Sequence, residues 1–187
     1  MHVKLLNIFD DCSDWDAYVL GHPQATVYHL SAWGRAVSRS MGHKYYYIYV
    51  EDKGKICGLL PLIHVKSRLF GNSLISVAFA TNGGPVFDHP EALALLDEEC
   101  KKLVKALGVD SLECRNMDQI HNDWPTKSEM YSTFRKELSP DNEENMNAIP
   151  RKQRAMVRKG IKFGLKAVID AQPDRLFAMY SESVRDL

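Results

Sequence analysis

The sequence predicts an α/β (α+β) fold in which helices flank a mostly antiparallel mixed sheet. Two β-rich runs within "KYYYIYVEDKGKICGLLPLIHVKS" are joined by the turn Asp52-Lys53-Gly54, which indicates a hairpin. A later segment has the period of an amphipathic helix, because its apolar residues recur every three or four positions. These residues are Leu93, Leu96, Cys100, Leu103 and Leu107. The whole order is helices, hairpin, strand, helix, strand.

The segment before the hairpin predicts one strand and two helices. Val3 to Phe9 is a β-rich run. A helix then begins near Ser13, a candidate N-cap, and ends at Gly21 and Pro23. Ser31 is a candidate N-cap for a second short helix, "SAWGRAVSRSMGH".

After the hairpin, "LISVAFA" (Leu74 to Ala80) predicts a strand that leads into the loop "TNGGPVFDHP". The long helix follows, with Pro90 in its first turn and Gly108 as its stop. Two further strands are predicted, "VDSLECR" at 109–115 and "STFRKEL" at 132–138.

The polar, acidic stretch "DNEENMN" (Asp141 to Asn147) predicts a domain boundary, with a first domain at 1–147 and a second at 148–187. The second part predicts a basic helix, the strand "LKAVI" at 165–169, and a helix from Pro173. Three elements bury too little apolar surface to fold alone. We therefore expect one full domain and the truncated beginning of a second.

Composition narrows the class of protein. The 187 residues carry 24 basic and 24 acidic side chains, and zero net charge argues against a general DNA or RNA coat. No run approaches the roughly 18 apolar residues of a membrane span, and the N-terminus lacks a signal-peptide pattern. The seven histidines and four separated cysteines show no metal-ligand spacing. We expect a cytoplasmic protein without a metal site.

The segment "AIPRKQRAMVRKGIKFG" concentrates positive charge without any acidic residue. On a helix, Arg151, Arg154, Arg158 and Lys162 fall on one stripe. Guanidinium groups bind phosphate and carboxylate oxygens through a planar fork, so the stripe favours a polyanionic ligand. The alternative is a solvated basic face, paired with the upstream acidic residues Glu143 and Glu144.

The loop "NGGPVFDHP" holds a second candidate site. Gly83 and Gly84 permit positive φ and a close approach of ligand to backbone. Asp88 has two interpretations: a cap of the following helix, or a carboxylate in a cleft that acts on an amine. Trp33 and Arg35 could line a pocket, although Trp on an amphipathic helix is more often buried.

A pyrophosphate-binding loop of the acyl-CoA type opens onto a helix N-terminus. The two nearest matches, "RLFGNS" at 68–73 and "RSMGHK" at 39–44, both fail at the last position, and a strand follows the first. This argues against an ordinary CoA-dependent enzyme.

The motifs together resemble the Fem-type (FemABX-like) aminoacyltransferases. The matching segments are "SAWGRAVSRSMGHK" with "GKICGLLPLI", then "FATNGGPVFDHPEALALLDE", then "IPRKQRAMVRKGIKFGL". Their order and spacing cover almost the entire chain. The most similar subgroup is the FemAB-related proteins associated with exosortase (PEP-CTERM) systems.

The resemblance implies two GNAT-like (acyl-CoA N-acyltransferase-like) domains and transfer of an aminoacyl group from aminoacyl-tRNA to an amine, with no bound cofactor. The acceptor would be a nucleotide-linked cell-envelope precursor, as in peptidoglycan synthesis. By matching position, Asp88 would be the catalytic residue near the acceptor, and Gly83 and Gly84 would contact substrate. The remaining substrate contacts would be Trp33, Arg35, Arg151, Lys152, Arg154 and Arg158, the last four facing phosphates of the precursor or of tRNA.

One position departs from the family pattern. Some members have a basic residue before Gly-Pro-Val, where this chain has Gly83. An exopolysaccharide or another amine is therefore an alternative acceptor. Two other classes stay open: an acyl-CoA-dependent GNAT acetyltransferase, and a non-catalytic GNAT-like module that binds a nucleotide-sugar or RNA. We expect residues 1–187 alone to be inactive.

Overall fold

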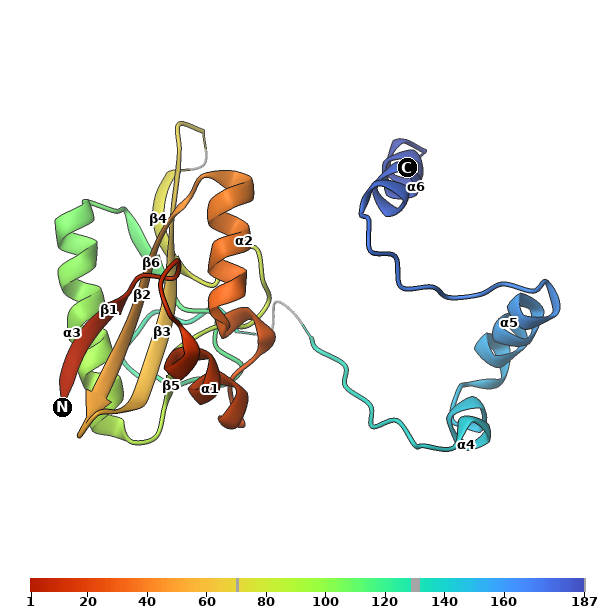
Figure 1. Cartoon of the computed structure of the whole chain (residues 1–187), viewed down its shortest axis with the longest axis horizontal. Helices are drawn as coiled ribbons and strands as arrows, with labels where there is room; N and C mark the ends of the chain where they lie inside the picture. Colours follow the sequence, from red (N-terminus) through yellow and green to blue (C-terminus); the bar gives the residue numbers. More distant parts are fainter. Residues whose placement is uncertain (70, 129–131, 187) are drawn as a thin grey trace. The chain divides into compact units, whose positions relative to one another are not determined.

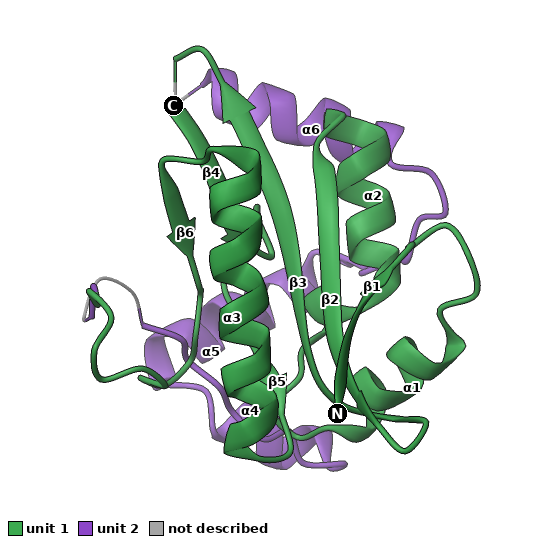
Figure 2. Cartoon of the chain, turned by 90° about the vertical axis from the view of Figure 1, so that its left-hand side faces the viewer, with its two compact units in different colours: residues 1–126 green, residues 127–187 purple. Residues whose placement is uncertain are grey.

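The computed structural model describes residues 1–69, 71–128 and 132–186. The chain divides into two compact units, Met1–Thr126 and Lys127–Leu187, coloured green and purple in Figure 2. We describe each unit by itself. The predicted domain boundary after Asn147 falls within the second unit and stays a prediction.

The first unit is built on a six-stranded sheet in the order β1-β2-β3-β4-β6, with β5 paired to β3. All pairs are antiparallel except β4 with β6, which is parallel. The predicted mostly antiparallel mixed sheet is confirmed. The strands are β1 (His2–Leu6), β2 (Lys44–Asp52), β3 (Lys55–Ser67), β4 (Gly71–Ser76), β5 (Val86–Phe87) and β6 (Ser111–Glu113).

Helices cover both faces of this sheet, as Figure 1 shows: α3 lies on one face, and α1 and α2 lie on the other. This arrangement confirms the predicted α/β fold class. The helices of the first unit are α1 (Ser13–Gly21), the short 3-10 helix η1 (Val27–His29), α2 (Ser31–Met41) and α3 (Pro90–Leu107). Neither Ser13 nor Ser31 is an N-cap, because each is the first residue of its helix.

The predicted hairpin is confirmed, and its turn has a simple cause. Asp52 pairs with Lys55 across the turn, and both central residues have positive φ, 48° at Lys53 and 80° at Gly54. A two-residue turn of this kind matches the right-handed twist of the strands it joins, and glycine adopts it without strain.

The tyrosine-rich strand β2 separates two core layers. Tyr47 is fully buried on the α1 side, where its ring stacks on Trp15 at 5.1 Å between centroids. Its neighbour Ile48 packs on the other face, against Leu96 of α3. Alternate side chains of a strand point to opposite faces, so the tyrosine run serves packing, as the pattern indicates.

Helix α3 begins and ends where the sequence predicts. Pro90 occupies its first turn, and Gly108 closes it in the left-handed conformation while its N–H donates to the Val104 carbonyl. Leu96 and Cys100 are fully buried against the sheet. Because local signals set both ends and the apolar face, this element follows from sequence alone.

Strand β3 changes partner halfway along its length. Leu62–Ser67 pairs with β4, whereas Gly58 and Leu59 pair with β5. In the segment between β4 and β5 the chain leaves the sheet, and the Val77 N–H there donates to the Pro61 carbonyl of β3 at 3.2 Å. The predicted strand at 74–80 is therefore wrong beyond Ser76, since Val77 (φ 49°) and Phe79 (φ 66°) have left-handed backbone. We call residues 77–85 the bracing loop.

The second unit contains α4 (Asn142–Asn147), α5 (Arg151–Lys162) and α6 (Asp174–Arg185). The predicted basic helix and the helix after Pro173 are confirmed. The predicted strands at 132–138 and 165–169 are wrong, because both stretches lack regular structure. A strand is stable only when its backbone pairs with a neighbour, and within residues 132–186 no strand is present to pair with.

Candidate functional site

Four carbonyl groups of the bracing loop each accept a hydrogen bond from a side chain outside the loop. Trp33 Nε1 donates to Ala78 at 3.4 Å, and Arg115 Nη1 donates to Ala80 at 2.7 Å. Thr26 Oγ1 donates to Asn82 at 3.3 Å, and His29 Nε2 donates to Gly84 at 2.9 Å. A loop held at four points from three segments is a rigid support for the residues that follow it.

Gly83 and Gly84 are buried in this loop, and both of their N–H groups donate to the Arg115 carbonyl, at 2.9 and 3.1 Å. Neither has positive φ. Glycine is required for a different reason: a Cβ on Gly83 would overlap the Val77 side chain, and one on Gly84 would overlap Asn116 Oδ1. Contact of the two glycines with substrate stays a prediction.

The hydrogen bonds of His29 fix its protonation. Nδ1 accepts the Thr26 N–H at 3.0 Å, so the ring proton lies on Nε2, which donates to Gly84. The side chain is almost completely buried, and this burial lowers the pKa of His29 below its ordinary 6.5. The neutral ring is the form that holds the loop.

Stability should therefore depend on pH through His29. The unfolded chain binds a proton more readily than the folded one, so stability is full above pH 6.5 and is lost as pH falls toward the lowered pKa of the folded state. We expect a slope of up to about 1.4 kcal/mol per pH unit in this range. Urea unfolding at several pH values measures it. His29→Gln should reduce the slope, and an equal slope in that variant would contradict the assignment.

Asp88 lies just after β5, where its N–H donates to the Cys57 carbonyl at 3.0 Å. Its interpretation as a helix cap is wrong. His89 occupies the N-cap position of α3, and no side chain caps that helix end. The Asp88 carboxylate is about half exposed, with a side-chain exposure of 48%. It instead faces two side chains of the α1 region.

Tyr18 holds one oxygen of this carboxylate through a hydrogen bond, and His22 approaches the same oxygen at a longer distance. Tyr18 OH donates to Asp88 Oδ1 at 3.0 Å, and His22 Nε2 lies 3.7 Å from the same oxygen. His22 Nδ1 accepts the Gln24 N–H at 3.2 Å, which places the ring proton on Nε2, toward Asp88. Burial, followed by the nearby Asp88 charge, raises the pKa of the Tyr18 phenol, so Tyr18 stays a donor. The sequence signal is faint: a Tyr and a His four residues apart at the end of a helix.

A groove of about 290 Å³ lies between α1 and the β2–β3 hairpin; Tyr18 is one of its walls, whereas Asp88 and His22 do not line it. Its other walls include Tyr49 and Ile56. Its charged side chains are Asp11, Asp14, Glu51 and Lys55, and Glu51 is paired with Lys4 at 2.8 Å. A cleft with this charge attracts cations more than anions.

Trp33 and Arg35 connect helix α2 to neighbouring segments of the first unit. Arg35 donates to the Ile8 carbonyl at 2.8 Å and to Ser31 Oγ at 2.7 Å, and so ties the segment after β1 to α2. The Trp33 ring packs edge-on against Tyr28, 4.9 Å between centroids. Neither residue lines the groove beside Tyr18. Their contact with substrate stays a prediction.

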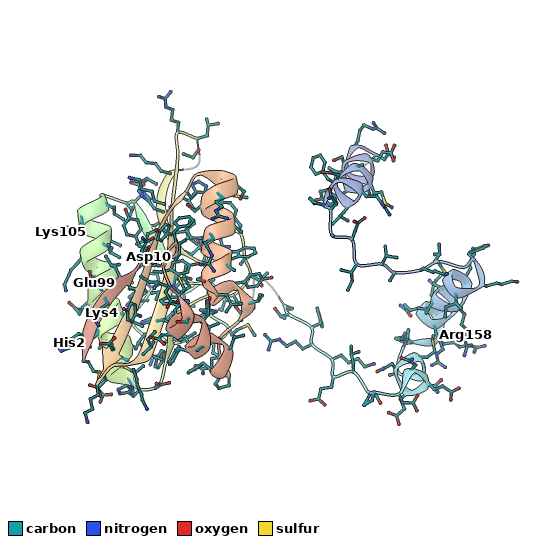
Figure 3. The ribbon with its side chains drawn as sticks, in the orientation of Figure 1. His2, Lys4, Asp10, Glu99, Lys105 and Arg158 are labelled. Carbon is teal, nitrogen blue, oxygen red and sulfur yellow. The ribbon has the colours of Figure 1, made fainter. Side chains whose placement is uncertain are left out.

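The basic side chains of α5 differ in their surroundings. Arg151, Lys152 and Arg158 are exposed, and Arg158 is labelled in Figure 3. Arg154 is half-buried, since its guanidinium donates to the carbonyls of Asn147 at 2.9 Å and Ile149 at 3.0 Å, next to the C-terminus of α4. Among the described residues, no ion pair joins α5 to Glu143 or Glu144. Arg154 therefore has a structural role at the junction of α4 and α5.

The two partial pyrophosphate motifs do not precede helix N-termini. Within "RLFGNS", Gly71 begins strand β4, and Phe70 lies outside the described residues. "RSMGHK" contains the end of α2, where Gly42 has φ 70°, and the chain then enters β2. Over the described ranges, no three His, Cys, Asp or Glu side chains form a metal-binding group, and no helix is long and apolar enough to cross a bilayer.

Comparisons with known proteins give structural matches only. No family model matches the chain, and no curated protein does. The crystal structure of FemX matches with a TM-score of 0.46 and 22% identity. The match covers 58% of this chain and 25% of the FemX chain. A ribosomal-protein-alanine N-acetyltransferase from Brucella melitensis biovar Abortus matches with a TM-score of 0.46 and 12% identity, covering 74% of this chain and 100% of that one. A GNAT family acetyltransferase from Staphylococcus aureus has a TM-score of 0.45 and 13% identity, covering 73% of this chain and 98% of that one.

Proposed function

We propose that this chain is the N-terminal part of a Fem-type N-acyltransferase, which transfers an aminoacyl or acyl group to an amine in cell-wall or exopolysaccharide metabolism. The motif resemblance supports the family. The observation that carries the chemistry is Asp88, an exposed carboxylate whose Oδ1 accepts the Tyr18 hydrogen bond. Among the described residues, no side chain or backbone donor bonds Oδ2, so this oxygen is accessible to a substrate.

The reaction needs an amine in its neutral form, so an acceptor that binds Asp88 as an ammonium group first loses one proton to solvent. The amine nitrogen attacks the carbonyl carbon of an aminoacyl ester, a new C–N bond forms, and the nitrogen loses a proton. Asp88 accepts this proton as the general base. The ester C–O bond then breaks, and the leaving oxygen takes the proton back. The donor is already activated, so orientation and proton transfer supply the catalysis, without a covalent enzyme intermediate.

We further propose that the exposed cations of α5, Arg151, Lys152 and Arg158, bind phosphates of a nucleotide-linked acceptor or of tRNA in the cytoplasm. Planar guanidinium groups suit this role. Arg154 is not assigned to phosphate, because its donors bond carbonyls of the α4–α5 junction.

The test is an acyl-transfer assay with the full-length gene product, read by mass spectrometry of the acceptor. Radiolabelled aminoacyl-tRNA and acetyl-CoA serve as alternative donors, with a nucleotide-linked muropeptide and simple diamines as acceptors. We expect acylation from aminoacyl-tRNA and none from residues 1–187 alone. Acylation from acetyl-CoA only would establish the CoA-dependent class instead. Binding of nucleotide-sugar or RNA with no transfer from either donor would contradict the enzyme assignment.

A further inference from the structure

We propose that Tyr18 and His22 are positioning residues, which turn Asp88 into a subsite for a primary ammonium group. This inference rests on the proposed function and deepens it, because it names the reacting group of the acceptor and two residues that prepare it. The residues come from distant parts of the chain: Tyr18 and His22 from the α1 region, and Asp88 from the end of β5.

The geometry fixes one carboxylate oxygen and leaves the other available. Tyr18 and His22 both approach Oδ1, at 3.0 and 3.7 Å. The two rings also contact each other, with centroids 5.4 Å apart. Both side chains are placed by the fold rather than by solvent: Tyr18 extends from α1, and the His22 ring is anchored through Nδ1 to the Gln24 N–H. An exposed Asp without such partners would sample several rotamers.

The backbone of Asp88 is also held in place. Its backbone N–H bonds the Cys57 carbonyl at 3.0 Å, and it follows the bracing loop and strand β5. A site on rigid elements, with its side chain held by neighbouring donors, keeps a bound group within the tolerance that catalysis needs.

The charge of the surroundings selects a cation. A free carboxylate oxygen accepts N–H bonds from an ammonium group, and charge-assisted bonds of this kind are stronger than neutral ones. The groove that shares Tyr18 as a wall carries Asp11 and Asp14 against Lys55, with Glu51 paired to Lys4, so its net charge is negative. The fitting ligand therefore carries a primary ammonium group.

NMR on the full-length protein tests the subsite directly. The probe is n-butylammonium chloride, with 1-butanol as its neutral counterpart, and the readouts are the Asp88 amide shift and the Asp88 Hα–Hβ couplings. We expect millimolar binding of butylammonium at Asp88 and no shift there with butanol. Asp88→Asn should abolish this selectivity, while Glu91→Gln, which removes an exposed charge in the first turn of α3, should preserve it.

The variants Tyr18→Phe and His22→Gln separate positioning from folding. Tyr18→Phe should weaken butylammonium binding roughly 3- to 10-fold, the loss of about one hydrogen bond, and His22→Gln, which removes a longer contact, should weaken it less. The Asp88 couplings should change from one rotamer to an average, while the melting temperature falls by only a few degrees. A purely structural role would instead leave the couplings and the selectivity unchanged in both variants, and that result would overturn the proposal.

This outcome is distinguishable from a failure of the proposed function. In one outcome, butylammonium binds Asp88 with the expected dependence on Tyr18 and His22 while the protein transfers no acyl group. That result supports the subsite and contradicts the enzyme assignment. If transfer occurs and the two variants keep wild-type couplings and butylammonium selectivity, the enzyme assignment stands and the positioning role is overturned.

Discussion

Replacing Gly83 with Ala is expected to destabilise the first unit by about 3 kcal/mol, a large part of the stability of a domain this size. The added Cβ would overlap the side chain of Val77. Val77 is β-branched, fully buried and in a left-handed backbone conformation, so it has little freedom to move. Chemical denaturation of the variant and the wild type measures the difference.

Two further variants show whether close packing is the cause. Gly21→Ala adds a Cβ where no atom lies within 4 Å and should change stability by less than about 1 kcal/mol. In a Val77→Gly background, Gly83→Ala should cost much less than in the wild type, because the overlapping atoms are gone. Equal costs of Gly83→Ala and Gly21→Ala would show that residue 83 tolerates a side chain.

The glycine pair shows how a sequence can indicate the right positions for the wrong reason. Gly-Gly in a loop suggests positive φ, which neither Gly83 nor Gly84 adopts. Their actual constraint is contact with Val77 and Asn116. Asn116 lies more than 30 residues away along the chain, so no local pattern could predict this contact.

Elements with local signals were predicted well. The β2–β3 hairpin has its glycine turn, and α3 has a proline start, a glycine stop and a regular apolar face. The partner change of β3 had no such signal, because "LISVAFA" is β-rich through Ala80 while the strand ends at Ser76. The stretches 132–138 and 165–169 are also β-rich, but strand formation depends on a pairing partner.

The candidate site was predicted only in part. Asp88 could be singled out because it follows a Gly-Gly-Pro loop, although its capping role proved wrong. Tyr18 donates to it across a separation of 70 residues, a pairing that only the fold creates. The basic helix was predicted correctly, but the role of Arg154 depends on where the α4 carbonyls lie.

The second large effect is expected at Asp88 itself. Asn at this position keeps an oxygen that can accept the Tyr18 hydrogen bond, yet it carries no charge and accepts no proton at neutral pH. If Asp88 takes the proton of the acceptor amine, Asp88→Asn should lower kcat of the full-length protein by about 10²- to 10⁴-fold. Folding and donor binding should be little affected.

The most direct test of Asp88 as the general base is the rate of amine acylation by Asp88→Asn compared with Glu91→Gln, measured on the full-length protein with the same donor. Both variants remove one negative charge near the start of α3. We expect a loss of at least about 100-fold in Asp88→Asn and near wild-type turnover in Glu91→Gln. Wild-type turnover in a correctly folded Asp88→Asn variant would contradict the general-base role of Asp88.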